Sequence, residues 1–241
     1  MRADVFLVEN GFARSRSEAQ AAIRGGLVRI DGALVGKPSH AVPMGAVIEY
    51  AKPHPFVSRG GVKLAAALDH FGLSPEGRAC LDLGASTGGF TQVLLQRGAA
   101  RVHAVDVGHG QMDAGLAGDP RIVIHDGVNA RDLTSARFSD GIMAITADVS
   151  FISLKLALPP ALSLASAGAW AVLLVKPQFE AGRGAIGKGG IVRDPAARQA
   201  VLAGIADFIA AEAGWRVLGS IESPIAGGDG NVEYLLAAVK Q

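Results

Sequence analysis

The chain contains little cysteine and few aromatic residues. Of its 241 residues only Cys80 is a cysteine, and Phe, Trp and Tyr together make up 5%. A single cysteine excludes an intramolecular disulfide, a Cys-based zinc site and an iron–sulfur cluster, and it is typical of a protein of the reducing cytoplasm. With so few aromatic residues, a nucleic-acid site built from a row of stacking rings is not expected.

Excess charge and long hydrophobic runs are also scarce. The formal net charge is +1, so any basic surface must come from the arrangement of charges and not from their number. The N-terminal segment MRADVFLVENG has acidic residues within its short apolar stretch, which argues against a secretory signal. The uncharged stretch between Lys155 and Lys176 is broken by Pro159-Pro160 and Gly168, which favours a buried helix and strand over a membrane span. We therefore expect no stable membrane association.

What the chain does contain is a regular alternation of strand-like and helical segments from about residue 59 onward. Apolar residues make up 49% of the chain and charged residues 19%, which is enough for a sizeable core. The strand-like runs are ACLDL, RVHAVDV, RIVIH, GIMAITA, AWAVLLV, WRVLGSI and VEYLLAAV. Their alternation with helices predicts the α/β class, with a doubly wound, Rossmann-like sheet that is covered by helices on both faces.

The first fifty residues follow a different pattern. Ser15 and Glu18 form a capping-box pair that begins a helix, which ends at Gly25-Gly26. Asp31-Gly32 then predicts a type I′ hairpin between two short apolar runs. We expect a small α+β domain over residues 1–50, a proline-containing linker over 51–58, and the α/β domain over 59–241. On the predicted helix Arg16, Gln20 and Arg24 align on one face, which on spacing alone is either solvated or a contact surface.

A glycine-rich loop follows the first strand of the α/β domain. Gly84-Ala85-Ser86-Thr87-Gly88 matches the G-x-S-x-G pattern of a serine-hydrolase nucleophile elbow. An elbow serine requires a histidine late in the chain, whereas the last histidine here is His125, on the third predicted strand. Ser86 is therefore not expected to be a nucleophile. Such a loop after a buried strand is also typical of a cofactor site at the carboxyl edge of the sheet.

Two acidic residues strengthen the cofactor interpretation. Asp106 ends the second strand, where a carboxylate binds the ribose hydroxyls of an adenosine cofactor, and Asp126 ends the third, where it can accept a hydrogen bond from an adenine amino group. The dinucleotide pattern G-x-G-x-x-G is absent because Ser86 takes the place of its middle glycine, so the loop favours S-adenosylmethionine over NAD. The expected cofactor contacts are Gly84, Ser86, Gly88, Gly89, Phe90, Asp106 and Asp126.

Four further charged residues are candidates for catalysis. Lys63 lies at the start of the helix before the sheet, Asp148 and Lys176 end the fourth and fifth strands, and Glu233 precedes the last strand. Desolvation at a buried strand end favours the neutral amine of a lysine, which can then act as a base. A buried network of structural ion pairs is an equal alternative on spacing alone.

The N-terminal segment DVFLVENGFARSRSEAQAAIRGGLVRIDG resembles the S-four RNA-binding domain, which grips structured RNA through its backbone. The resemblance implies that Arg14, Arg16, Arg24 and Arg29 contact phosphates. Arg59 and Lys188 are further expected RNA contacts. Lys188 lies in a glycine-rich segment, residues 180–193, which is either a flap over RNA or a mobile surface loop.

Lys63, Asp148, Lys176 and Glu233, in that order around the glycine loop, resemble the K-D-K-E tetrad of FtsJ-type RNA ribose 2′-O-methyltransferases. The chain as a whole resembles the TlyA family of haemolysin-named ribosomal RNA methyltransferases. The motifs that carry this resemblance, in order, are FVSRGGVKL, LDLGASTGGFT, VDVGHGQ, NARDL, ADVSFISL, VKPQFEAG, GKGGIVRD and GNVEYL. The chain departs from the family at MDAGLAGDP, which lacks tryptophan and basic residues, and at Asp126, where a glutamate is expected.

The TlyA resemblance implies a seven-stranded sheet whose last strand is antiparallel, with S-adenosylmethionine as cofactor and no metal. It also implies that Lys176 activates a cytidine 2′-hydroxyl of ribosomal RNA while Asp148 orients Lys176, with ribosomal RNA or subunits as partners in the cytoplasm. The modified nucleotide and the oligomeric state stay open. Two other functions are alternatives: an RNA-binding assembly factor with little turnover, against which the complete tetrad argues, and a pore-forming haemolysin, which no signal or clean span supports.

Overall fold

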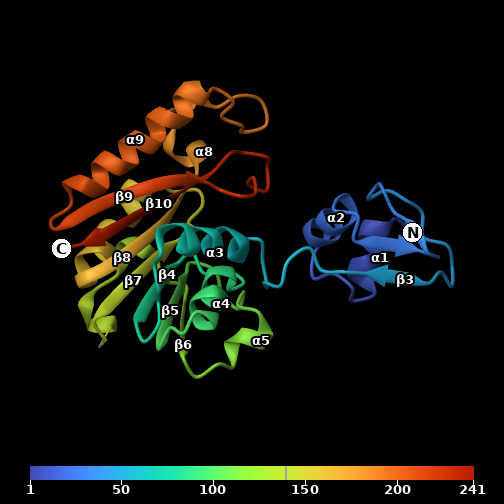
Figure 1. The fold of residues 1–241 in the computed structure, drawn as a ribbon, viewed down its shortest axis with the longest axis horizontal. Helices are drawn as coiled ribbons and strands as arrows, with labels where there is room; N and C mark the ends of the chain where they lie inside the picture. The colour runs from blue at the N-terminus through green and yellow to red at the C-terminus, as the bar shows by residue number, and fades with distance from the viewer. Residues whose placement is uncertain (139) are drawn as a thin grey trace. The chain divides into compact units, whose positions relative to one another are not determined.

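The computed structural model describes residues 1–138 and 140–241. The chain divides into two compact units, Met1–Pro55 and Phe56–Gln241 (Figure 1). Each unit has its own hydrophobic core and is described by itself.

The first unit is two helices followed by a small antiparallel sheet. Its helices are α1 (Ala3–Glu9) and α2 (Arg16–Arg24), and its strands are β1 (Val28–Ile30), β2 (Ala33–Leu34) and β3 (Ile48–Tyr50), in the order β2-β1-β3. The Ser15 hydroxyl caps α2 by accepting a hydrogen bond from the Glu18 amide at 3.2 Å. Asp31 and Gly32 have φ angles of 49° and 76°, as a type I′ turn requires. The cap and the hairpin predicted from the sequence are therefore both confirmed.

The second unit contains the large sheet. Its helices and strands are α3 (Gly60–Phe71), β4 (Ala79–Leu83), α4 (Gly89–Gln96), β5 (Arg101–Asp106), α5 (Ala114–Ala117), β6 (Ile122–Asp126), β7 (Ile142–Ala147), α6 (Leu154–Ala157), α7 (Pro159–Leu164), β8 (Ala165–Val175), α8 (Pro177–Glu180), α9 (Pro195–Ala211), β9 (Trp215–Glu222) and β10 (Tyr234–Lys240). Short 3₁₀ turns cover Ala130–Asp132, Ser135–Arg137 and Arg183–Ala185. The seven strands lie in the order β6-β5-β4-β7-β8-β10-β9, and β10 runs antiparallel to both of its neighbours. The predicted doubly wound sheet with an antiparallel last strand is confirmed.

Helices cover both faces of this sheet (Figure 1). Leu235 of β10 joins the cluster that α3 and α4 form with one face, and its neighbour Leu236 joins the cluster that α7 and α9 form with the other. This alternation follows from the two-residue period of a strand. Within the described residues, no helix is both long and apolar enough to cross a bilayer.

The boundary between the units differs from the expected linker. Residues 56–58 pack with the second unit, because the Phe56 ring lies against Gly61, where a Cβ atom would come within 2.3 Å of it. The Val57 amide also donates to Gln92 Oε1 at 2.7 Å. Helix α3 accordingly begins at Gly60, three residues before Lys63.

The position of the site follows from the strand order. From β4 the chain adds β5 and β6 on one side and then returns to add β7 and β8 on the other. Where a parallel sheet reverses its order in this way, the loops after the two central strands separate and leave a crevice. The loops after β4, β7 and β8 are the ones that carry the predicted chemistry.

Candidate active site

The glycine loop lies directly against the segment that follows β7. The Asp148 amide donates to the Leu83 carbonyl at 2.9 Å. Gly84 has a φ of +76°, and a Cβ atom there would lie 2.6 Å from the Asp148 carbonyl oxygen. Only glycine accepts both the left-handed backbone and this close approach. The cofactor loop and Asp148 are thus held at a fixed separation.

The far side of the glycine loop is tied to the end of β5. The Asp106 carboxylate accepts hydrogen bonds from the amides of Ser86 and Gly108, at 2.8 Å and 2.7 Å. Gly84, Ser86 and Asp106 line a cavity of about 1300 Å³. Pockets for a single drug-sized ligand occupy about 300–1,000 Å³. This cavity therefore has room for an adenosine cofactor together with part of a second substrate.

Four of the residues expected to bind the cofactor are not among the described residues that line this cavity. Phe90 is 3% exposed and packs in the core beside Gly60, because α4 turns it toward α3. A Cβ atom on Gly88 would lie 2.5 Å from Met112 Sδ, and one on Gly89 would lie 2.0 Å from Ser58 Oγ, so both glycines allow neighbouring side chains to approach closely. The Asp126 carboxylate accepts from the Gly110 amide at 2.7 Å.

The four candidate catalytic side chains meet in a second cavity of about 450 Å³. They form two ion pairs. The Lys63 amine bonds the Glu233 carboxylate, and these side chains are 7% and 3% exposed. Lys176 Nζ lies 2.6 Å from Asp148 Oδ1, with the side chains 11% and 24% exposed. One pair is therefore buried, and the other remains more open to an incoming substrate.

The two cavities are adjacent and share part of their lining. Both are lined by Asp148, Ser150, Phe151, Gln178 and Phe179. The buried Gln178 Oε1 has no hydrogen-bond partner among the described residues, so it is free to accept one from a ligand. A cofactor in the larger cavity and an acceptor in the smaller would meet at this shared wall.

Phe151 is the most unusual residue of the shared wall. It has a φ of +63°, rare for a bulky side chain, and it is 92% exposed. Its ring centroid lies 5.1 Å from that of Phe179. An exposed ring in a strained backbone at the mouth of a cavity is a candidate for ligand contact and not for core packing.

Sequence reasoning missed Ser150, Phe151, Gln178 and Asn231. The first three lie two or three residues after the predicted Asp148 or Lys176, in ADVSFISL and VKPQFEAG. The motifs therefore contained these residues but did not assign them a role. Asn231 is fully buried. It accepts from the Val192 amide and donates to the Gly190 carbonyl, both at 3.0 Å. It thereby pins the end of the glycine-rich segment beside the smaller cavity, which Gly190 lines.

A buried carboxylate connects the elements that carry the site. Asp82 of β4 accepts hydrogen bonds from the hydroxyls of Thr91 on α4 and Thr146 on β7, at 2.7 Å and 2.9 Å. Burial raises the pKa of Asp82 to about 6, and the two threonine hydrogen bonds oppose this rise. Asp82 thus joins the three elements whose ends carry the glycine loop and Asp148.

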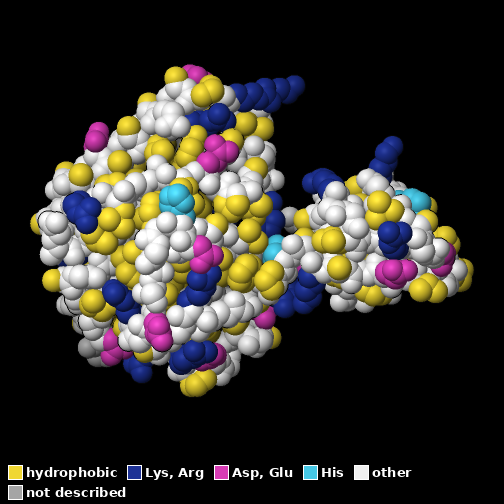
Figure 2. Space-filling model, in the orientation of Figure 1, with side chains coloured by type: hydrophobic (Ala, Val, Ile, Leu, Met, Phe, Trp, Pro, Cys, Tyr) yellow, Lys and Arg dark blue, Asp and Glu magenta, His cyan; other side chains and the backbone are white. Residues whose placement is uncertain are grey.

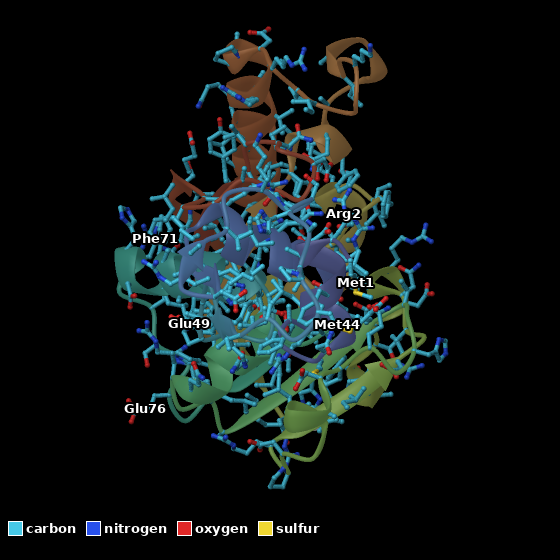
Figure 3. The ribbon with its side chains drawn as sticks, turned by 90° about the vertical axis from the view of Figure 1, so that its right-hand side faces the viewer. Met1, Arg2, Met44, Glu49, Phe71 and Glu76 are labelled. Carbon is cyan, nitrogen blue, oxygen red and sulfur yellow. The ribbon has the colours of Figure 1, made fainter. Side chains whose placement is uncertain are left out.

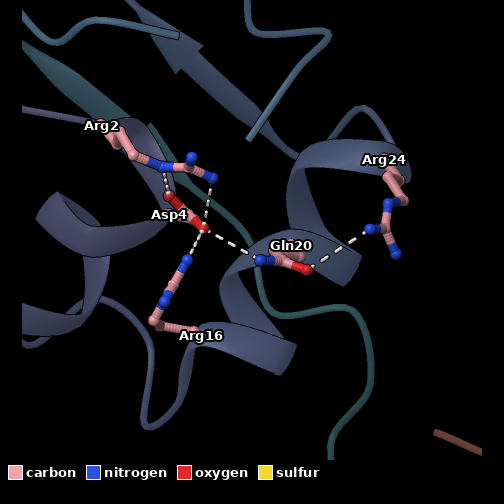
Figure 4. Close-up of polar contacts among 5 residues, drawn as sticks. All are labelled: Arg2, Asp4, Arg16, Gln20 and Arg24. Carbon is pink, nitrogen blue, oxygen red and sulfur yellow. Dashed lines mark hydrogen bonds and ion pairs between the residues drawn. The ribbon is translucent and has the colours of Figure 1, made fainter. Parts of the chain in front are cut away.

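In the first unit, the face of α2 that carries Arg16, Gln20 and Arg24 belongs to a hydrogen-bond network around Asp4 (Figure 4). Asp4 is fully buried and accepts hydrogen bonds from Arg2, Arg16 and Gln20, each at 2.9 Å. Gln20 in turn accepts from Arg24 at 3.4 Å. The Arg2 guanidinium, helped by Arg16 and Gln20, holds the pKa of Asp4 well below its usual range despite the burial of this carboxyl.

The arginines of this network still face solvent. The side chains of Arg2 and Arg16 are 51% and 58% exposed. Arg2, which no sequence motif indicated, is labelled in Figure 3, and Lys and Arg side chains project from the first unit in Figure 2. Of the other predicted RNA contacts, Arg29 donates to the Gly32 carbonyl at 2.9 Å, and Arg14 lies just before the Ser15 cap of α2. Arg59 precedes α3, and Lys188 is exposed.

A doubly wound sheet, a glycine loop at its switch point and a lysine–acid tetrad beside it define an S-adenosylmethionine-dependent methyltransferase. The FtsJ-like methyltransferase family matches residues 56–240, and the S4 domain family matches residues 1–48. The chain belongs to the TlyA group of FtsJ-like methyltransferases, which carry an S4 domain at the N-terminus. S-adenosylmethionine, and not NAD, is accordingly its cofactor.

Relatives match along almost the whole chain. TlyA of Mycobacterium tuberculosis, named a 16S/23S rRNA (cytidine-2′-O)-methyltransferase, is 47% identical over 98% of this chain and 88% of its own length. Hemolysin A of Brachyspira hyodysenteriae is 41% identical over 98% of both chains. A solved structure of a haemolysin-named protein from Streptococcus thermophilus has a TM-score of 0.78 and 39% identity, covering 100% of this chain and 88% of that one.

Proposed function

We propose that this protein transfers a methyl group from S-adenosylmethionine to a ribose 2′-hydroxyl of ribosomal RNA, with cytidine as the modified nucleoside. The observation that carries the proposal is the meeting of Lys63, Asp148, Lys176 and Glu233 in one cavity that shares its lining with the cofactor cavity. The M. tuberculosis relative, named for cytidine-2′-O-methylation, supports the choice of substrate. Since its substrate is ribosomal RNA, we place the protein in the cytoplasm.

The proposed chemistry is an in-line transfer. When bound, S-adenosylmethionine supplies an electrophilic methyl group on a positively charged sulfur. Lys176 Nζ takes the proton of the 2′-hydroxyl as the oxygen–methyl bond forms and the sulfur–methyl bond breaks. Asp148, 2.6 Å from Nζ, orients the amine and stabilises the charge that it gains.

The Lys63–Glu233 pair forms a rigid polar part of the lining of the smaller cavity. Because both side chains are almost fully buried, their ion pair cannot rearrange without leaving an uncompensated charge. A Cβ atom on Gly227 would lie 2.6 Å from Glu233 Oε1, so the loop before β10 also closes against this pair. We assign Lys63 and Glu233 to holding the ribose beside Lys176.

The first unit supplies RNA affinity in this proposal. One buried carboxylate orients the guanidinium groups of Arg2 and Arg16, which bond it through Nε and Nη2 of Arg2 and through Nη2 of Arg16. The Nη1 group of each arginine is left for phosphate oxygens. Two arginines around one aspartate leave a net positive charge that is already ordered before RNA binds. Contacts of this kind position the RNA without reading its sequence.

Mapping ribose methylation tests the proposed function. Ribosomal RNA from cells with and without the gene is compared nucleotide by nucleotide, and the purified protein is then added to subunits from the deletion strain. We expect at least one cytidine to lose its 2′-O-methyl group in the deletion strain and to regain it in vitro. Identical methylation maps from the two strains would refute the proposal.

Loss of the ordered arginines should weaken RNA binding and its salt dependence together. For the Arg2→Ala/Arg16→Ala double variant we expect the slope of log K against log salt to become shallower by about 1.5, because each lost phosphate contact releases about 0.7–0.9 fewer counterions. Fluorescence anisotropy with ribosomal RNA over a salt series measures this slope. The Arg97→Ala/Arg121→Ala variant removes the same charge from the second unit and is the control for charge, while thermal melts show whether the first unit stays folded around the buried Asp4. Equal slopes for the two variants would contradict the assignment.

Phe151 should act as a stacking surface for the target nucleobase. Removing one base–aromatic stack costs about 1–3 kcal/mol, so Phe151→Ala should lower kcat/KM for RNA by about 5- to 150-fold. Phe151→Trp should retain most activity, whereas Phe151→Leu, which keeps an apolar side chain without a ring, should behave like the alanine variant. Methyl-transfer kinetics measure the effect, with cofactor affinity as a control. Full activity of the leucine variant would rule out stacking.

A further inference from the structure

We propose that Ser150 is a positioning residue for Lys176, fixing the direction in which this amine meets the acceptor hydroxyl. The proposal deepens the function proposed above and rests on it. Lys176 Nζ donates to Ser150 Oγ at 2.7 Å and lies 2.6 Å from Asp148 Oδ1. Ser150 therefore gives the amine a second oxygen partner, in addition to the acid of the tetrad.

Two partners define the orientation of an amine where one does not. With Asp148 alone, Nζ can turn about its last carbon–nitrogen bond while it keeps a single hydrogen bond. When Asp148 and Ser150 each accept one N–H, two of the tetrahedral positions around nitrogen are occupied. Cε holds a third position, and the fourth carries the lone pair when the amine acts as the base and the received proton afterwards. Both states keep the same two hydrogen bonds, so no reorganisation is needed during the reaction.

The backbone explains why Ser150 is well placed for this role. Ser150 follows Asp148 by two residues, on the segment that Gly84 contacts through the Asp148 carbonyl. The glycine loop of the cofactor cavity, Asp148 and Ser150 therefore form one supported unit. Ser150 also lines both the cofactor cavity and the acceptor cavity, so its bond to Lys176 lies beside the wall that they share.

Lys176 has a third neighbour that limits its movement without directing its hydrogen bonds. Its Nζ lies 5.9 Å from the centroid of the Phe179 ring, within range of a cation–π contact. A ring face attracts the charge but does not select which N–H points where. Direction at the nitrogen is therefore set by the oxygens of Asp148 and Ser150.

The test compares Ser150→Ala, Ser150→Thr and wild type in single-turnover methylation of ribosomal subunits from cells lacking the gene, with S-adenosylmethionine labelled in its methyl group. A hydrogen bond to a charged group contributes about 1.5–3 kcal/mol, so Ser150→Ala should slow the transfer step about 10- to 150-fold. The affinities for S-adenosylmethionine and for the subunits should stay within about twofold of wild type, because the contact acts on Lys176 and not on binding. Ser150→Thr, which keeps the hydroxyl, should recover most of the rate.

The controls separate this proposal from the function on which it rests. Ser163→Ala removes an exposed hydroxyl that donates to the Pro160 carbonyl, and it should behave as wild type. If wild type transfers no methyl group to the subunits, the proposed function fails. If wild type is active and Ser150→Ala transfers at the same rate, or loses subunit affinity instead of rate, the positioning role is overturned. Threonine and alanine variants that are equally slow while cofactor affinity and melting temperature stay unchanged would also overturn it.

Discussion

Replacing Lys176 with alanine should reduce methyl transfer by about 10²–10⁴-fold, because removal of a general base raises the barrier by about 3–5 kcal/mol. The loss should fall on the transfer step, since the amine takes its proton only as the oxygen–methyl bond forms. Affinities for S-adenosylmethionine and RNA should change little. Single-turnover assays on ribosomal subunits measure the rate, and calorimetric titration measures the cofactor affinity.

The arginine variant at this position separates catalysis from structure. Lys176→Arg keeps a positive charge beside Asp148, but a guanidinium does not release its proton near neutral pH. We therefore expect it to be almost as slow as Lys176→Ala while melting close to wild type. If the Lys176–Asp148 pair only stabilises the fold, the result reverses: the arginine variant works and the alanine variant is less stable. A folded arginine variant at near wild-type rate would end the general-base assignment.

Breaking the Lys63–Glu233 pair should have the largest effect on stability. Glu233→Ala leaves the Lys63 charge in a site where the side chain is only 7% exposed. Removal of one partner from a buried ion pair costs about 3–5 kcal/mol. Urea unfolding should show this loss in the free energy of unfolding, together with loss of methyl transfer.

A double variant and a surface control make this result specific. Lys63→Met/Glu233→Met replaces both charges with apolar groups and should recover most of the lost stability, because no uncompensated charge remains. It should not recover activity if the pair holds the ribose. Arg97→Ala breaks an ion pair whose side chains are 42% and 61% exposed, and it should change stability by less than about 1 kcal/mol. Similar losses in Glu233→Ala and Arg97→Ala would contradict the buried-pair argument.

The closeness of Asp148 and Lys176 could be predicted because both residues follow the ends of strands. Asp148 and Lys176 each follow a run of buried residues, and parallel strands end at the same edge of a sheet. From their spacing alone, these residues could equally form a network of structural ion pairs with no catalytic role. The structure places these residues in a cavity that shares its lining with the cofactor cavity, which is why the catalytic interpretation is proposed.

Only part of the predicted cofactor set lines the large cavity. Gly84, Ser86 and Asp106 line the large cavity, whereas Phe90 belongs to the core. The motif LDLGASTGGFT does not reveal on which side of α4 a residue falls, because this depends on how α3 packs against α4. The polar face of α2 was likewise not fully predictable from the sequence. Arg16 and Gln20 have the spacing of a solvated face, yet both bond the buried Asp4.

The sequence by itself determined the secondary structure of this protein and the order of its strands along the chain. These features depend on local chemistry: the Ser15 cap, the positive φ angles of Asp31-Gly32 and the alternation of strand-like and helical runs act over a few residues each. Only the tertiary structure decided which charges pair and which oxygens surround Lys176. Lys63 and Glu233 are 170 residues apart, and their contact exists only because α3 and the start of β10 meet across the folded unit. The bond from Lys176 to Ser150 likewise depends on the parallel pairing of β7 with β8, which brings the two strand ends together.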